Sequence, residues 1–395
     1  MMPRNRPACN DRQGVTIHKA DKCSLGYTLY WGRKEGRASL IDMDGRIVHE
    51  WMYGGDSIWH HADMLQNGNL IALINDGCLR HFNGRRGLLA VSLQISRYIW
   101  CSGLNGARHL ARIALGGYRP DINIGRRLVE VDWDSNLVWS DPVHVHHDAR
   151  RLSNGNTLVV AHDRAQYLHI SPRVHLYDYL QEITPDNKVV WEWHAATHVD
   201  ELKDLVDVVA RDWAGDWPHI NTVEALPDTP LGREDERFRM GNILVSPRHL
   251  HCIFIIEKES GKIVWAWGPG EILGQHQPTM LGNGNILLFD NGHGNDAAED
   301  RDYSRVIEIQ PATGEIVWKY QADPPEAFWS PVGSGQQRLP NGNTLICAMN
   351  WSETGRIFEV TPTGEIVWEF WDPEAQALYR AARYSPAWVE PLLSR

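Results

Sequence analysis

Histidines that recur at one position of an internal repeat are the residues of this chain best suited to chemistry. The repeat contains a turn of the form Leu-x-Asn-Gly-Asn, and the residue five positions before the leucine is His60, His147, His276 and Ser334 in four copies. In a fifth copy, His219 lies close to the same place. A set of imidazoles can transfer protons, attack an electrophile or bind a divalent metal. The pattern therefore predicts a site to which several repeats each contribute one side chain.

Arg248 and Asn221 bear on what such a site can bind. Asn221 follows His219 by two residues, and Arg248 lies just past the second strand expected in the same repeat. A guanidinium is a poor neighbour for a divalent cation, but together with imidazoles and an amide it can hold the oxygens of a sulfuryl or phosphoryl group. The alternative is a metal-dependent lyase or oxygenase with Fe or Zn in a four-histidine centre. Its ligands would be His60, His147, His219 and His276.

A second motif, seen as Gly-Glu-Ile-Val-Trp-Glu-Phe at 364–370, occurs six times along the chain and shows how these residues are positioned. Its first aliphatic residue, an isoleucine, leucine or valine, stands at positions 47, 137, 189, 263, 316 and 366, so the basic period is about 50 residues. A turn residue followed by alternating β-branched and aromatic residues is typical of a hairpin that enters a half-buried strand. With two hairpins per unit, the sequence predicts an all-β fold, a six-bladed β-propeller whose first strands line a central channel.

The two ends of the chain are expected to close the ring. Residues 25–371 form the predicted propeller, with an N-terminal extension at 1–24 and a C-terminal tail at 372–395. The N-terminal unit supplies only three strands. The tail is the candidate for the fourth, because Tyr384–Pro386 resembles Trp329–Pro331 at the start of the first strand in the preceding blade. This arrangement would cover an exposed sheet edge in the first blade.

Two insertions interrupt the repeats. Residues 80–127 contain nine arginines, no lysine and a single acidic residue, Asp121. This Arg-rich insertion is either a cover that brings positive charge to a channel receiving an anion, or an oligomer contact or solvated loop. The second insertion, residues 201–215, carries apolar side chains at helical spacing and is predicted to be a short helix packed between blades.

Composition limits the classes of binding partner and the cellular compartment that we expect. The formal net charge of -11 opposes nucleic-acid binding, and no run of residues is apolar enough for a membrane span. The six cysteines are scattered and include no C-x-x-C pair. The N-terminus lacks the apolar stretch of a secretory leader, which predicts a cytoplasmic protein, or a periplasmic one if a leader was removed. We expect a small-molecule substrate; the oligomeric state is open, with a homo-oligomer among the alternatives.

Several short motifs, in order along roughly residues 25–386, resemble the arylsulfotransferase family of bacterial aryl-sulfate sulfotransferases. They are Gly26–Leu29, Leu40–Gly45, His146–Asp148, Asp216–Asn221, Gly274–His276, Phe289–Gly292 and Gln337–Leu345. The resemblance implies a six-bladed propeller that moves a sulfuryl group from an aryl sulfate to a phenol without a nucleotide sulfate donor. It implies no cofactor.

Carried over residue by residue, the resemblance makes His276 the nucleophile of a ping-pong cycle with a sulfohistidine intermediate. Residues that would bind the sulfuryl oxygens and handle protons are His147, His219, Asn221 and Arg248. His60 and Ser334 are further candidates for substrate binding because they share the register of His276. The chain departs from the family at Gln277–Thr279 and at His60, where an aliphatic or aromatic residue is expected. A third alternative is a non-catalytic binding propeller with vestigial histidines.

Overall fold

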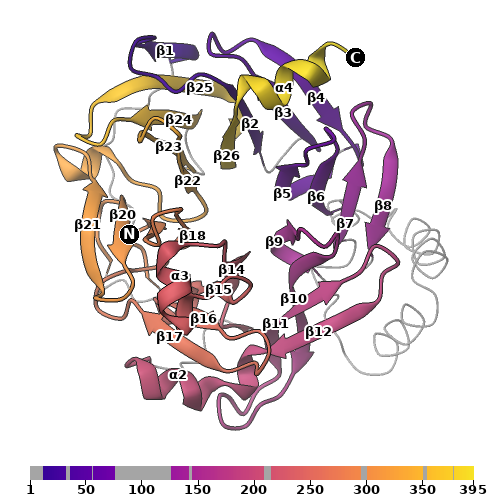
Figure 1. Cartoon of the computed structure of the whole chain (residues 1–395), viewed down its shortest axis with the longest axis vertical. Helices are drawn as coiled ribbons and strands as arrows, with labels where there is room; N and C mark the ends of the chain where they lie inside the picture. Colours follow the sequence, from indigo (N-terminus) through magenta and orange to yellow (C-terminus); the bar gives the residue numbers. More distant parts are fainter. Residues whose placement is uncertain are drawn as a thin grey trace, which may run out of the picture.

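Six antiparallel sheets stand around a common centre as the blades of a β-propeller, which confirms the predicted fold class (Figure 1). The computed structural model describes residues 12–32, 36–55, 57–75, 126–141, 145–208, 215–294, 300–349, 354–376 and 378–395. Each blade has its first strand nearest the centre and its last strand at the rim.

The first three blades are built as follows. The first blade runs outward from β26 (Leu378–Tyr384) through β2 (Tyr27–Gly32) and β3 (Arg37–Ile41) to β4 (Ile47–Met52). The second has the order β5 (Ile58–Met64), β6 (Leu70–Asn75), β7 (Arg126–Val131) and β8 (Leu137–Asp141). The third has the order β9 (Val145–Arg151), β10 (Thr157–Ala165), β11 (His175–Ile183) and β12 (Val189–His194), with the short β13 (Asp216–Trp217) paired to β11.

The remaining blades repeat this plan. The fourth consists of β14 (Ile220–Ala225), β15 (Ile243–Pro247), β16 (Ile253–Ile256) and β17 (Ile263–Trp267). The fifth consists of β18 (His276–Met280), β19 (Ile286–Asp290), β20 (Arg305–Gln310) and β21 (Glu315–Tyr320). The sixth consists of β22 (Gly335–Arg338), β23 (Thr344–Ala348), β24 (Thr354–Val360) and β25 (Ile366–Gln376).

The tryptophan of the Ile-Val-Trp motif joins each blade to the next. Its indole N–H donates to a backbone carbonyl in a turn of the following blade, at 2.8 to 3.1 Å. The five bonds are Trp139 to Pro185, Trp191 to Lys258, Trp265 to Pro311, Trp318 to Pro362 and Trp368 to Met43. The first blade has His49 at this position, and its ring stacks on Trp133 of the second blade with centroids 3.7 Å apart. The repeated motif is therefore the contact that holds the ring together.

The C-terminal segment completes the first blade, although the strand lies earlier than the sequence suggested. β26 pairs antiparallel with β2, and Tyr384 lies opposite Tyr27. Tyr384–Pro386 therefore ends the strand, and helix α4 (Pro386–Leu393) begins there. At the other end of the chain, β1 (Gly14–His18) pairs with the outer edge of β25, so part of the 1–24 extension adds a fifth strand to the sixth blade.

The described helices are short and lie outside the sheets. Helix α2 (Val199–Leu205) buries Val199 and Leu202 in the core shared by the third and fourth blades, as expected for a packing helix. It ends before the predicted Gly215, since Val206 is extended, and residues 209–214 lie outside the described part. The others are α3 (Pro230–Glu234) and the 3-10 turns η1 (Ala195–Thr197), η2 (Glu236–Phe238), η3 (Arg248–Leu250) and η4 (Pro325–Ala327). None of the helices in the described ranges has the length and apolar character needed to cross a bilayer.

The Arg-rich insertion falls almost entirely outside the described residues. Of the segment 80–127, only Arg126 and Arg127 are described, at the start of β7. The two roles considered for the insertion therefore stay predictions.

Candidate active site

The candidate site residues gather on the innermost strands of consecutive blades. His60 lies in β5, His147 in β9, Asn221 in β14 and His276 in β18, and these four strands surround the centre of the ring (Figure 1). Two further candidates lie beside an innermost strand: His219 immediately precedes β14, and Ser334 immediately precedes β22.

Several of these residues have a backbone conformation that non-glycine residues rarely adopt. The φ angles of His147, His219 and Ser334 are 61°, 64° and 75°, and that of Gln277, next to His276, is 49°. The register of strand pairing shifts near three of them, in β9, β14 and β18. A bulge that recurs in the innermost strands of these three blades re-aims side chains, and strained backbone conformations gather at functional sites.

The register of the fourth blade differs from the sequence alignment. The turn bond that Leu65 N–H makes to Asn69 O in the second blade corresponds to Leu226 N–H bonded to Asn242 O in the fourth. Asn221 stands five residues before Leu226. In the fourth blade, Asn221 therefore occupies the position that His60, His147 and His276 occupy in their blades, and His219 lies two residues upstream of it. The sequence concealed this because α3 and η2 are inserted between Leu226 and its Gly-Asn turn.

His276 is held as a neutral imidazole with one defined tautomer. Its Nδ1 lies 2.8 Å from Asn291 Oδ1 and 3.1 Å from the carbonyl oxygen of Gly274. Both partners accept, because the Asn291 amide nitrogen donates to the carbonyls of Ser330 and Gly333. Nδ1 therefore carries the hydrogen, and Nε2 keeps its lone pair. Burial, with the positive charge of Arg248, lowers the pKa of His276 well below its usual value.

His147 is coupled to its neighbour in the chain. Strand alternation predicts that His146 and His147 point to opposite faces, yet the Nδ1 atoms of the two rings lie 2.5 Å apart. The left-handed backbone of His147 explains the difference, because it breaks the alternation. His146 also contacts Asp178 Oδ1 through Nε2 at 2.9 Å. Desolvation and the nearby His219 lower the pKa of His147 well below its usual value.

His219 forms a pair with a carboxylate. Its Nδ1 lies 2.6 Å from Asp216 Oδ2, and its ring meets that of His147 edge-on with centroids 4.6 Å apart. The His219 ring also stacks on the ring of His249, with centroids 4.6 Å apart. Although burial of its carboxylate opposes ionisation, the partly exposed Asp216 has a lowered pKa because His219 stabilises its charge. An imidazole oriented by a carboxylate in this way is suited to carry a proton.

Two arginines bring positive charge to the centre. Arg248, in η3, is buried, and its Nη2 lies 3.5 Å from the carbonyl oxygen of His293. Gly274 lies next to this contact and has a φ of 62°. A Cβ atom on Gly274 would stand 2.1 Å from the carbonyl oxygen of His293 and 3.5 Å from Nη2 of Arg248. Burial lowers the pKa of Arg248, although a guanidinium remains charged. Only glycine at position 274 allows the backbone before His276 to come this close to the His293 carbonyl and the Arg248 guanidinium.

The second arginine, Arg380 of β26, gave no signal in the sequence. It is 2% exposed and donates to Asp148 Oδ1 at 3.1 Å, to the carbonyl of Asn221 at 2.9 Å and to Thr222 Oγ1 at 2.8 Å. The C-terminal strand is thereby tied to the third and fourth blades across the centre of the ring. The charge of Arg380 contributes to the lowered pKa of His276.

Three predicted ligand-binding residues are occupied in structural contacts. The amide of Asn221 donates to the carbonyl of Gln275 at 2.7 Å and accepts from Thr222. The hydroxyl oxygen of Ser334 accepts from the backbone N–H of Met349 at 3.0 Å. His60 is buried in β5 and close enough to His147 to contribute to its lowered pKa. The Asn221 amide nitrogen has a second hydrogen with no acceptor among the described residues, so it can donate to a ligand.

The four-histidine metal centre is not assembled in the described part of the chain. There, the group that brings three candidate ligand atoms within 4.8 Å of one another is instead His146, His162 and Asp178. Positive charge from Arg248 is a physical reason against a cation among His60, His147, His219 and His276.

Comparisons with known proteins give a family match and, separately, a likeness of fold. The model of the arylsulfotransferase (ASST) family matches residues 125–373. A protein of unknown function from Bacteroides caccae is 12% identical and has a TM-score of 0.54, covering 91% of this chain and 99% of that one, which is a likeness of fold. The propeller domain of Cps50 (Swd1) from Myceliophteria thermophila is 10% identical with a TM-score of 0.43, over 93% of this chain and 88% of that one. No curated protein matches the sequence.

Proposed function

The chain belongs to the arylsulfotransferase family, and on this premise we propose that it transfers a sulfuryl group from an aryl sulfate to a phenolic acceptor through a sulfohistidine at His276, without a nucleotide sulfate donor. The observation that carries the proposal is the fixed tautomer of His276. Asn291 Oδ1 and the Gly274 carbonyl both accept from Nδ1, so the lone pair is on Nε2. The lowered pKa keeps that lone pair free of a proton at neutral pH.

In the first half of the cycle, Nε2 of His276 attacks the sulfur atom of the aryl sulfate. The N–S bond forms, the bond between sulfur and the aryl oxygen breaks, and its electron pair leaves with the phenolate. Nδ1–H stays bonded to Asn291 Oδ1 at 2.8 Å and stabilises the positive charge that develops on the ring. Arg248 and Arg380, whose charges act on His276, also stabilise the negative sulfuryl oxygens in the transition state.

His219 is the general acid and base in this mechanism. Asp216 accepts from Nδ1, which orients the ring and leaves Nε2 as the nitrogen that exchanges a proton. It protonates the leaving phenolate, whose conjugate acid ordinarily has a pKa of about 10. In the second half, it takes the proton from the acceptor phenol. The phenol oxygen then attacks sulfur, and the N–S electron pair returns to His276.

Mass spectrometry of the intact protein after brief incubation with p-nitrophenyl sulfate tests the nucleophile. Wild type is expected to gain the mass of one SO3 group, which acid removes, and His276→Ala is expected to gain none. His169→Ala is the matched control, because His169 binds the carbonyl of Ala196 outside the site, in the loop between β10 and β11. An adduct that persists in His276→Ala would refute this route.

His219→Ala separates the two halves of the cycle. Nitrophenolate is a good leaving group that needs little protonation, so the variant should still form the adduct. Turnover with a phenolic acceptor should fall about 10²- to 10⁴-fold, the usual contribution of a general base. A folded wild-type protein that forms no adduct with any aryl sulfate would favour the binding propeller instead.

A further inference from the structure

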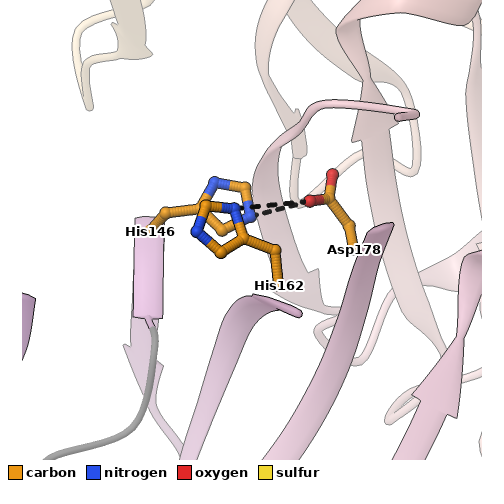
Figure 2. Close-up of side chains that lie close together, drawn as sticks. All are labelled: His146, His162 and Asp178. Carbon is orange, nitrogen blue, oxygen red and sulfur yellow. Dashed lines mark hydrogen bonds and ion pairs between the residues drawn. The ribbon is translucent and has the colours of Figure 1, made fainter. Parts of the chain in front are cut away.

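A second cluster of ligand-type side chains lies inside the third blade, apart from the His276 centre. His146 comes from β9, His162 from β10 and Asp178 from β11, so three adjacent strands each supply one residue. Figure 2 shows both imidazole rings directed at the carboxylate of Asp178. All three side chains are buried, with exposed fractions of 1%, 3% and 1%.

The distances within this cluster are close to those of a metal-bound set. His146 Nε2 lies 2.9 Å and His162 Nδ1 lies 4.0 Å from Asp178 Oδ1. In a tetrahedral zinc site with bonds of roughly 2.0 to 2.2 Å, neighbouring ligand atoms lie roughly 3.4 Å apart. The two rings stack with centroids 4.3 Å apart and 22° between their planes. All three ligand atoms lie within 4.8 Å of one another, so adjustment of the side chains would bring them to one ion.

Two of the three ligand residues are oriented by an outer partner, as in established metal sites. The second oxygen of Asp178, Oδ2, accepts from the backbone N–H of Ile220, which leaves Oδ1 for the cluster. The other nitrogen of His146, Nδ1, contacts His147 Nδ1. Such contacts fix the orientation and tautomer of metal ligands.

The charges around the cluster favour a cation. Asp216 lies on β13, which pairs with β11, the strand that carries Asp178. Asp216 Oδ1 is buried and has no hydrogen-bond partner among the described residues. Two carboxylates in one blade, one of them the buried Asp178, would both be stabilised by a nearby divalent ion.

We propose that His146, His162 and Asp178 bind one divalent transition-metal ion, with Zn²⁺ as the best match to two imidazoles and a carboxylate. The ion would tie together the inner parts of β9, β10 and β11. It is distinct from the four-histidine centre considered from the sequence, since it uses none of those residues.

Metal binding would also set the tautomer of His147. With Nε2 of His146 on the ion, its Nδ1 must carry the hydrogen and donate to His147 Nδ1. His147 then holds its own hydrogen on Nε2 and can donate to a sulfuryl oxygen. This consequence rests on the proposed function, whereas the metal site does not.

The test measures metal on the full-length protein by two independent means. Purified wild type is analysed for zinc by mass spectrometry, stripped with a chelator and titrated with Co²⁺, whose visible d–d bands report tetrahedral ligation. We expect one ion per chain, and an affinity loss of about 10- to 100-fold or more in His162→Ala and Asp178→Asn. His169→Ala, in the same blade, is the matched control and should bind as wild type does.

X-ray absorption of the wild-type zinc form keeps the test decisive if the variants fold poorly. Two imidazoles and oxygen ligands at about 2.0–2.2 Å are expected. Three outcomes would each overturn the proposal. The first is sulfur ligation, and the second is the absence of both bound Zn²⁺ and Co²⁺ bands. The third is loss of the metal in His276→Ala together with its retention in His162→Ala. The last result would instead support the four-histidine centre.

Discussion

Replacing Asn291 by alanine should slow sulfohistidine formation without removing the nucleophile. Asn291 Oδ1 accepts the Nδ1–H of His276 at 2.8 Å, and its own amide nitrogen is fixed by the carbonyls of Ser330 at 2.7 Å and Gly333 at 3.1 Å. The orientation of the amide therefore decides which nitrogen of His276 carries the hydrogen. In the variant, the Gly274 carbonyl at 3.1 Å remains as the single acceptor for Nδ1 in the described surroundings.

The magnitude follows from one lost neutral hydrogen bond. Such a bond contributes about 0.5–1.5 kcal/mol, and a tenfold change in rate corresponds to about 1.4 kcal/mol. The labelling rate should therefore fall about 2- to 13-fold. The two carbonyls that lose the Asn291 amide are buried, so the free energy of unfolding should also fall, by about 1–3 kcal/mol.

Single-turnover labelling with p-nitrophenyl sulfate, followed by intact mass, measures the rate, and urea unfolding measures stability. Asn343→Ala is the matched control, because the Asn343 amide is also buried and donates to Glu359 Oε1 at 2.7 Å, in the sixth blade and away from His276. It should lose stability and keep the wild-type labelling rate. An unchanged rate in folded Asn291→Ala would refute the reasoning, because the tautomer would then not depend on this amide.

Three further predictions concern the stability of the ring, and urea unfolding measures each of them. Arg380→Met should lower the free energy of unfolding by about 3–5 kcal/mol, because it removes one partner of a buried ion pair. Trp368→Phe should lower the free energy of unfolding by about 1–3 kcal/mol. Trp139→Phe should lower it by less: both variants lose an indole hydrogen bond to the next blade, but of the two tryptophans only Trp368 is fully buried. The free energy of unfolding should also fall as the pH drops below about 6.5. Burial lowers the pKa of His249 to about 3 in the folded state and lowers that of His276 well below its usual value, whereas the unfolded chain takes up protons near the usual value. Each such histidine therefore contributes a loss of up to about 1.4 kcal/mol per pH unit.

Each of these predictions has a contrary outcome. A loss below about 1 kcal/mol in Arg380→Met would mean that the C-terminal strand does not depend on the central ion pair. Equal losses in the two tryptophan variants would show that burial does not govern the contribution of the inter-blade bond. A free energy of unfolding that stays constant between about pH 7.5 and about pH 5.5 would contradict the neutral state of the buried histidines.

The repeat was sufficient to predict the propeller from the sequence. Strand β21 and its counterparts follow from alternation of β-branched and aromatic residues after a turn, which is a local property. The recurring tryptophan is explained by a contact to the next blade, and the same contact occurs in five of the six units. The start of the closing strand was misplaced because Tyr384–Pro386 resembles a strand start, whereas β26 begins at Leu378 and Pro386 begins a helix.

The site was only partly accessible to sequence reasoning. His147 and His276 were found because a common distance from a turn places residues on equivalent strands. The shift from His219 to Asn221 could not be seen, because an insertion hides the turn that sets the register. Asn291 stood in a recognisable motif, but its effect on the His276 tautomer depends on carbonyls 39 and 42 residues away.

The sequence by itself thus determined the number of blades, the strands within them and two central histidines, because these depend on short-range periodicity. Only the tertiary structure brought Arg380 to partners 158 to 232 residues away and gathered His146, His162 and Asp178 from three strands. Contacts between such distant residues leave no local pattern in the chain. They exist because closing the ring brings six innermost strands to one centre, where burial and charge are decided jointly by several blades.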